Sequence, residues 1–101
     1  ALADRYREAF ADAEGVSFFE EPDGARSNYW LNVLLLNPET ADHRDAVLEH
    51  TNASGFMTRP TWTLMNKLPM YSDCPHMDLS TAQSLERRLV NIPSTPTLVS
   101  L

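Results

Sequence analysis

A chain of 101 residues with 43% apolar and 22% charged residues can form one globular domain around a single core. Its formal net charge of −6 and its scattered basic residues exclude the clustered Lys and Arg of a nucleic-acid-binding surface. A single cysteine excludes an internal disulfide, and no apolar run has the length of a membrane span.

These totals define the compartment and partners that we expect. Residues 1–10 are charged and lack the continuous apolar core of a signal peptide. A lone cysteine fits a reducing environment. The sequence therefore predicts a cytoplasmic domain with neither a nucleic-acid nor a membrane partner.

The first part of the chain predicts one helix and two strands. In residues 1–15 apolar side chains recur at helical spacing, and Gly15 ends the pattern. Residues 16–20 predict a short strand before a Pro-Asp-Gly turn at 22–24. The run 27–37 is apolar at both alternating positions, so we expect a central strand covered on both faces.

The second part predicts two helices with a short strand between them. Residues 40–55 form a helical pattern with Thr40 as the expected N-cap and Gly55 at the C-terminal end. Residues 56–59, "FMTR", predict a short strand, and residues 78–93 predict a helix. The expected buried stripe of this last helix consists of Leu79, Ala82, Leu85 and Leu89.

Asp78 or Ser80 is the expected cap of that last helix. The element order is then helix, strand, strand, helix, strand, helix. This order predicts an α+β two-layer domain with a small, mainly antiparallel sheet packed with helices.

The hexapeptide "DCPHMD", residues 73–78, contains side chains that can bind metals. A tetrahedral site needs ligands from two separated pairs, but His43 and His50 belong to a helix elsewhere. We therefore expect no metal site and a turn that leads into the next helix. Cys74 has no oxyanion-hole motif beside it, so we expect a buried or inert thiol instead of a nucleophile.

Residues 58–75, "TRPTWTLMNKLPMYSDCP", fit neither a helical nor a strand period over their full length. The guanidinium of Arg59 suits a carboxylate or a phosphate. Trp62 and Tyr71 offer flat faces for stacking, and Lys67 adds a positive charge. This combination indicates a binding segment.

The alternative is a structural loop that packs Met65, Leu68 and Met70 against the sheet, with Arg59 in an ion pair, for instance with Asp73. Composition alone favours this alternative, because long irregular segments are only sometimes functional.

A longer pattern bears on this choice. "GFMTRPTWTLMNKLPMYSDCP", followed by a helix and "RRLVNIPS", resembles the C-terminal domain of the DegT/StrS group of nucleotide-sugar aminotransferases. The strand "SNYWLNVLLL" resembles the family's His-Leu-Tyr strand, so the resemblance covers most of the chain. The residues that match the family pattern unchanged are Gly55, Thr58, Arg59, Pro69, Tyr71 and Pro93.

The chain departs from the family pattern at four positions. Trp62 replaces a tyrosine, and Thr61, Asn66 and Trp30 stand where many members have histidine. The Arg-Pro-x-Trp-x-Leu-Met version is similar to the branch that acts in nonulosonic (legionaminic-type) acid pathways.

The resemblance implies an aspartate aminotransferase (fold type I) small domain and an enzyme that uses pyridoxal phosphate. In that family the Schiff-base lysine and most cofactor contacts lie in a larger N-terminal domain. The one lysine here, Lys67, lies in the wrong motif for that role. Residues 1–101 then form a C-terminal small-domain fragment that lacks its catalytic N-terminal large domain. We expect it to bind no pyridoxal phosphate and to be inactive by itself.

The resemblance also implies the partners, which are the missing large domain, a second subunit in a homodimer, and a nucleotide-sugar substrate. The substrate would be a nucleotide-linked keto-sugar that accepts an amino group. This chain would contribute no catalytic and no cofactor-binding residue. The expected substrate-binding residues are Arg59, Trp62, Asn66, Lys67 and Trp30.

An excised domain would also expose an apolar patch where its partner packed, and Phe10, Trp30 and Trp62 are the expected residues. The competing hypothesis is a free-standing α+β ligand-binding or protein-interaction module without catalytic activity.

Overall fold

The computed structural model describes residues 1–97. The elements in chain order are α1 (Leu2–Ala9), β1 (Val16–Phe18), β2 (Asn32–Leu36), the 3-10 helix η1 (Pro38–His43), α2 (Arg44–Ala53), β3 (Arg59–Pro60), the 3-10 helices η2 (Met65–Lys67) and η3 (Pro69–Tyr71), α3 (Ser80–Arg88) and β4 (Leu89–Ile92). The predicted α+β class is confirmed.

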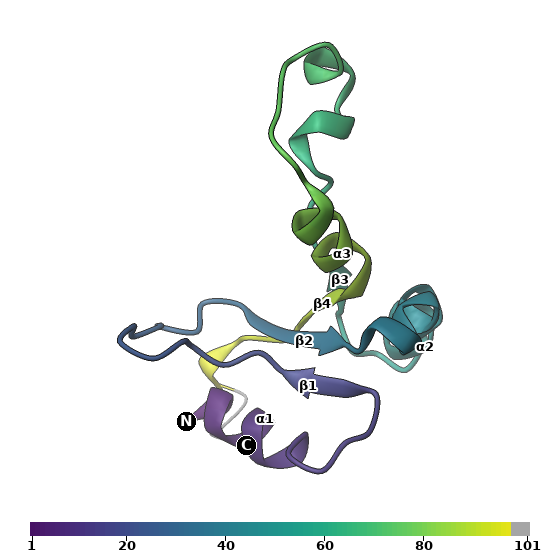
Figure 1. The fold of residues 1–101 in the computed structure, drawn as a ribbon. Coiled ribbons are helices and arrows are strands. Elements are labelled where there is room, and N and C mark those ends of the chain that lie inside the picture. The colour runs from purple at the N-terminus through teal and green to yellow at the C-terminus, as the bar shows by residue number, and fades with distance from the viewer. Residues whose placement is uncertain (98–101) are drawn as a thin grey trace.

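The strands form one antiparallel sheet in the order β1-β2-β4-β3 (Figure 1). β2 pairs with β1 on one side and with β4 on the other, where Leu34 lies opposite Val90. β2 is therefore an inner strand, as its apolar sequence predicts. β3 forms the far edge and pairs Arg59 with Asn91.

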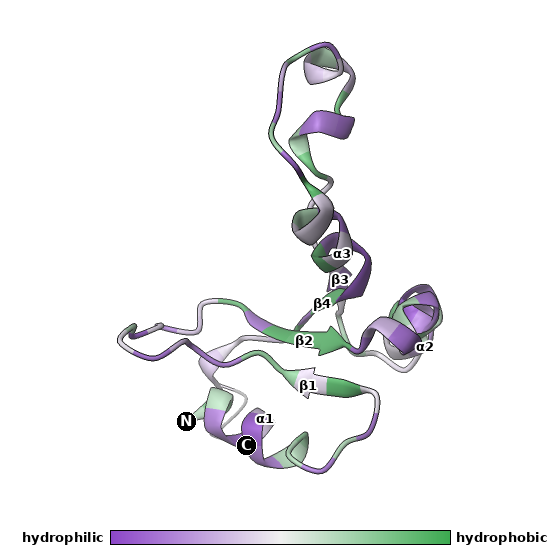
Figure 2. Ribbon diagram, viewed as in Figure 1, coloured by the Kyte–Doolittle hydropathy of each residue, from purple (hydrophilic) through white to green (hydrophobic). Residues whose placement is uncertain are grey.

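The core lies on the face of the sheet that α1 covers. It consists of Phe18, Leu34, Val90 and Ile92. Tyr6 and Phe10 of α1 pack against this cluster, and the Tyr6 hydroxyl donates to the carbonyl of Pro93 (2.8 Å). The apolar colouring of β1 and β2 in Figure 2 follows the same layer. The two faces of β2 differ, because one is buried and the other is only half-buried.

β2 begins at Asn32, later than predicted. Tyr29 has a φ of 49°, which lies in the left-handed region and interrupts an extended strand. The side chains of Ser27 and Asn28 accept hydrogen bonds from the backbone N–H groups of Tyr29 and Trp30 (2.9 and 3.0 Å). These local bonds favour turns over sheet pairing.

The expected helix over residues 78–93 is wrong beyond Arg88. α3 ends there, and Leu89–Ile92 form the inner strand β4, in which Val90 is 1% exposed. The helical spacing of Leu79, Ala82 and Leu85 continues in sequence to Leu89, but pairing with two neighbouring strands outweighs it. None of the residues of α3 is fully buried.

The predicted caps are also wrong. Asp78 and Ser80 bond to each other (2.7 Å), and neither caps the helix. Thr40 lies inside η1, and its hydroxyl donates to the carbonyl of Gly15 (2.7 Å). The predicted role of Gly55 agrees with the structure, because it follows α2 with a φ of 90° that glycine adopts readily.

We call residues 61–79 the arm. After β3 the arm extends away from the sheet, forms η2 and η3, and then returns to the start of α3 (Figure 1). The Cα radius of gyration of 15.2 Å exceeds the ~13 Å of a compact domain of this length. Met65 and Met70 are 65% and 70% exposed. The alternative in which they pack against the sheet is therefore wrong.

Candidate functional site

A cleft of about 530 Å³ lies where the arm leaves the sheet. This volume falls within the usual range of small-molecule sites. The residues that line it are Leu31, Arg59, Pro60, Thr61, Trp62, Thr63 and Asn91. Two of the predicted binding residues, Arg59 and Trp62, therefore meet at one cleft.

The direction of Arg59 follows from its backbone. Pro60 holds the preceding residue extended, and pairing with Asn91 fixes Arg59 at the edge of the sheet. Its Nη1 donates to Asn52 Oδ1 (2.9 Å) and to the carbonyl of Thr58 (2.7 Å).

Both of these acceptors are neutral. Across residues 1–97, no carboxylate pairs with Arg59, so the alternative of an ion pair with Asp73 is wrong. Arg59 lines the cleft, and no side chain in the described part of the protein compensates the charge of its guanidinium. Such a group suits an anionic ligand.

Trp62 supplies a flat apolar surface on the same cleft, and it is 69% exposed. On the same cleft, the carboxamide of Asn91 donates to the carbonyl of Pro60 (3.3 Å), which joins β4 to the end of β3, where the arm begins. The half-buried Leu31 adds an apolar wall. An exposed indole beside a guanidinium can stack on a ring and hold a charged group next to it.

Lys67 lies elsewhere and forms an ion pair with Glu86 of α3. Glu86 Oε2 also accepts the backbone N–H of Leu64 (2.7 Å), and its side chain is only 13% exposed. The hydrogen bond from Lys67, and then that from Leu64, hold the pKa of Glu86 below its usual value of 4.5. Lys67 lines an adjoining recess of about 290 Å³ together with Arg44 and Arg87, and this recess shares Pro60, Thr61 and Thr63 with the cleft.

The other two predicted binding residues do not line the cleft. Trp30 is 74% exposed and is the chain neighbour of Leu31. Asn66 is half-buried in η2, and its Oδ1 has no hydrogen-bond partner among residues 1–97. Asn66, Lys67 and Trp30 thus do not line the cleft of Arg59 and Trp62, although the recess that Lys67 lines adjoins it.

Sequence reasoning missed Leu31, Asn91 and Glu86 as parts of this region. The alternation in "LVNI", with Val90 and Ile92 buried, is the signal that could have identified β4 and therefore placed Asn91 opposite Arg59. Glu86 gives no such signal, because its partners lie 19 and 22 positions away in sequence.

The other side chains considered from sequence are mostly at the surface. Cys74 is exposed, so of the two predicted alternatives, a buried or an inert thiol, the buried one is wrong. Phe10 packs against the core and does not join an exposed patch, whereas Trp30 and Trp62 are exposed as expected. In the described residues 1–97, no group of His, Cys, Asp and Glu is arranged to hold a metal ion. None of the helices in this range combines the length and apolar character needed to cross a bilayer.

Comparison with known proteins identifies similar sequences and folds. The sequence model of the DegT/DnrJ/EryC1/StrS aminotransferase family matches residues 1–100. GDP-perosamine synthase from Vibrio cholerae is 30% identical over 96% of this chain. The crystal structure of DesI with its TDP-sugar product matches 91% of the chain with a TM-score of 0.80 and 28% identity.

A further solved structure shows the same fold at lower identity. The aminotransferase TlmJ from Streptoalloteichus hindustanus matches 98% of the chain with a TM-score of 0.79 and 18% identity. In each case this chain spans about a quarter of the matched protein, with 26% of GDP-perosamine synthase, 24% of DesI and 27% of TlmJ.

Proposed function

The chain belongs to the DegT/DnrJ/EryC1/StrS aminotransferase family, and we propose that it is the C-terminal small domain of a longer enzyme. That enzyme transfers an amino group to a nucleotide-linked keto-sugar and uses pyridoxal phosphate. The quarter-length coverage of GDP-perosamine synthase and DesI supports the proposed fragment. The names of these relatives, which include a GDP-linked and a TDP-linked sugar, support the substrate class.

The domain's part in this activity is to hold the substrate. The observation that supports this role is that Arg59 lines the 530 Å³ cleft and that its guanidinium has no carboxylate partner in residues 1–97. A nucleotide diphosphate offers oxygens that match a guanidinium. Trp62, beside it, is exposed and can stack on the sugar or the base.

The residues of this chain do not fit the cofactor. Pyridoxal phosphate supplies an electron sink when bound, and it needs a lysine amine for its Schiff base. The one lysine, Lys67, is tied to Glu86 and lies outside the Arg59 cleft. We therefore assign the cofactor and its lysine to an N-terminal large domain that this chain lacks.

The same proposal assigns partners to the exposed arm. Met65, Met70 and Met77 are 65%, 70% and 88% exposed, and a large domain and the second subunit of a homodimer would cover such side chains. We also propose that this enzyme acts in a nonulosonic (legionaminic-type) acid pathway and is located in the cytoplasm. A reading frame that encodes only about this length would instead support the free-standing module.

The test compares Arg59→Lys with Arg5→Lys in the longer enzyme. Arg5 is an exposed arginine of α1 that is remote from the cleft, so it controls for the substitution itself. We expect Arg59→Lys to raise KM for the nucleotide-sugar by about tenfold, which corresponds to about 1.4 kcal/mol and lies within the roughly 1–3 kcal/mol of a lost charge-assisted bond. Melting temperatures should be equal in the two variants. An unchanged KM in Arg59→Lys would remove the binding role.

A further inference from the structure

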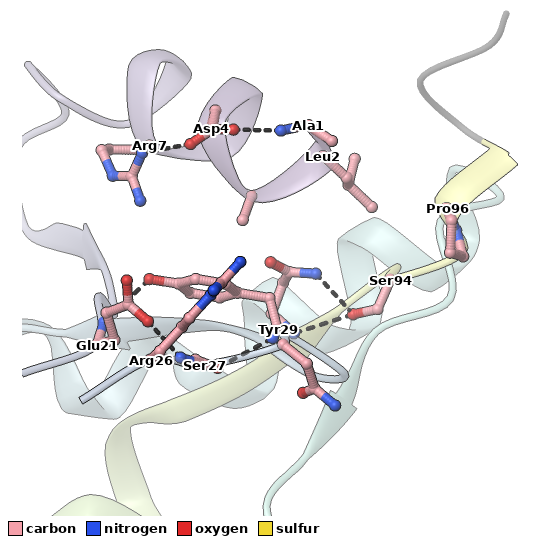
Figure 3. Close-up of a pocket in the computed structure, with 13 residues that line it drawn as sticks. Ala1, Leu2, Asp4, Arg7, Glu21, Arg26, Ser27, Tyr29, Ser94 and Pro96 are labelled. Atoms are coloured by element: carbon pink, nitrogen blue, oxygen red, sulfur yellow. Dashed lines mark hydrogen bonds and ion pairs between the residues drawn. The ribbon is translucent and has the colours of Figure 1, made fainter.

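A second cavity, of about 540 Å³, lies on the opposite side of the domain from the arm, between α1 and the loop that precedes β2 (Figures 1 and 3). Residues 94 and 96, which follow β4, close one end of it. The wall formed by the loop is held in place. The Tyr29 ring stacks on Phe18 at a centroid distance of 5.9 Å, and its hydroxyl accepts the backbone N–H of Glu21 (3.0 Å).

A buried hydrogen-bond acceptor in this cavity has no partner. Asn32 lines the cavity and is 2% exposed. Its backbone N–H and its Nδ2 both donate to Ser94 Oγ, at 2.9 and 3.1 Å. Ser94 has one hydroxyl proton, and this proton is donated to the carbonyl of Ile92 (3.1 Å).

These bonds fix the orientation of the Asn32 amide. Because Ser94 Oγ can only accept from Asn32, Nδ2 must face Ser94 and Oδ1 must face away. Across residues 1–97, Oδ1 has no donor. A buried acceptor left unpaired is costly, so a ligand that brings a donor gains more here than at the surface.

The charges around the cavity are of both signs. Arg7 is occupied by Asp4 and Glu20, the N-terminal ammonium of Ala1 is also paired with Asp4, and Glu21 accepts the backbone N–H of Ser27. Arg26 makes no hydrogen bond or ion pair among the described residues, and its side chain extends from the loop into the space below α1 (Figure 3). The cavity therefore contains the unpaired cation of Arg26, the unpaired acceptor Asn32 Oδ1, and the carboxylates of Asp4 and Glu21.

We propose that this cavity is a second binding site, which takes a small zwitterion of the α-amino acid type. Its carboxylate pairs with Arg26, and its ammonium donates to Asn32 Oδ1. A purely anionic ligand would pair with Arg26 but leave Asn32 Oδ1 without a donor, and a purely cationic one would leave Arg26 without a partner. The site shares no lining residue with the Arg59 cleft and does not depend on the function proposed for that cleft.

The experiment is an NMR titration of the 101-residue chain with L-alanine, followed through backbone amide shifts. Sodium acetate and methylammonium chloride, which each carry one of the two charges, are the matched half-ligands. We expect alanine to produce saturable shifts at Asn32, Tyr29 and Ser94. Each half-ligand should bind at least about tenfold more weakly, because it makes only one of the two contacts.

Variants assign the contacts. Arg26→Met should weaken alanine binding about tenfold, whereas Arg5→Met, a matched change on the exposed face of α1, should leave binding unchanged. Asn32→Leu should abolish binding without lowering the melting temperature, because it also removes the unpaired acceptor. If Asn32→Leu does not fold, the Arg26→Met result decides. Absence of saturable shifts, equal binding of acetate and alanine, or unchanged affinity in Arg26→Met would each overturn the proposal.

Discussion

Glu86 is the side chain on which we expect the position of the arm to depend. It accepts the backbone N–H of Leu64 and the ammonium of Lys67, which both belong to the arm. Its own backbone is held separately, because Arg44 Nη1 donates to the Glu86 carbonyl (2.6 Å). Glu86→Gln therefore changes the side-chain anchor and leaves the bond from Arg44 to the end of α3 intact.

The expected cost follows from the exposure of the partners. The Lys67 side chain is 47% exposed and that of Glu86 is 13% exposed, so water screens the charge of Lys67 more than that of Glu86. Such a pair contributes about 0.5–1 kcal/mol, and the Leu64 bond loses its charge assistance at a similar cost. We expect Glu86→Gln to lower the free energy of unfolding by about 1–2 kcal/mol, or the melting temperature by roughly 5–10 °C.

The pH dependence gives an independent check. Because the pKa of Glu86 is lowered on folding, its carboxylate stabilises the folded state above the unfolded value of about 4.5. This stabilisation is lost as the pH falls through the folded pKa. The difference between wild type and Glu86→Gln should therefore be full at neutral pH and should disappear in strongly acidic solution.

The assay is urea unfolding of the 101-residue chain, carried out once at neutral pH and once in strongly acidic solution. Glu49→Gln is the matched control, because Glu49 is an exposed residue of α2 that makes no side-chain hydrogen bond or ion pair within residues 1–97. In a Trp30→Phe background the fluorescence of Trp62 reports on the arm, and far-ultraviolet circular dichroism reports on the whole fold. Equal unfolding free energies for Glu86→Gln and Glu49→Gln at neutral pH would refute the reasoning. A difference that persists at acidic pH would refute it too.

Three further outcomes are expected. Val90→Ala should destabilise the fold by about 2 kcal/mol in urea unfolding, because Val90 is 1% exposed at the centre of the sheet; an equal cost for Leu89→Ala, which is only half-buried, would argue against this reason. Thr40→Val should lower the free energy of unfolding by about 1 kcal/mol, because it removes the hydrogen bond to the Gly15 carbonyl. Thr40→Ser keeps the hydroxyl and should retain this stability, so a Thr40→Ser variant as unstable as Thr40→Val would contradict the assignment. Cys74 should react with a thiol reagent in the native chain about as fast as in urea, and strong protection would show that it is buried.

Local chemistry allowed part of this structure to be predicted. The prediction that Arg59 lies in a strand is confirmed, because Pro60 restricts its backbone whatever the rest of the chain does, but β3 begins at Arg59 and the predicted strand residues 56–58 lie outside it. The inner position of β2 followed from its apolar run. The α+β class followed from the order of the elements, although the prediction lacked β4.

The errors arose where distant contacts decide the conformation. Leu89 continues the helical spacing of α3, and only pairing with β2 and β3 makes it the first residue of a strand. Lys67 lies five positions from Trp62 in the sequence, but it pairs with Glu86 and lines the adjoining recess instead of the cleft. Such partners cannot be read from the composition of a segment.

The junction between α3 and β4 has a mechanical consequence. α3 ends at Arg88 and β4 begins at Leu89, so no flexible residue separates the helix from the strand. The Arg88 side chain also donates to the carbonyl of Leu36 at the end of β2 (2.8 Å). A force applied to the arm would pass through Glu86 and α3 directly to β4. Because β4 carries Asn91, a partner that bends the arm would also change the width of the cleft beside Trp62.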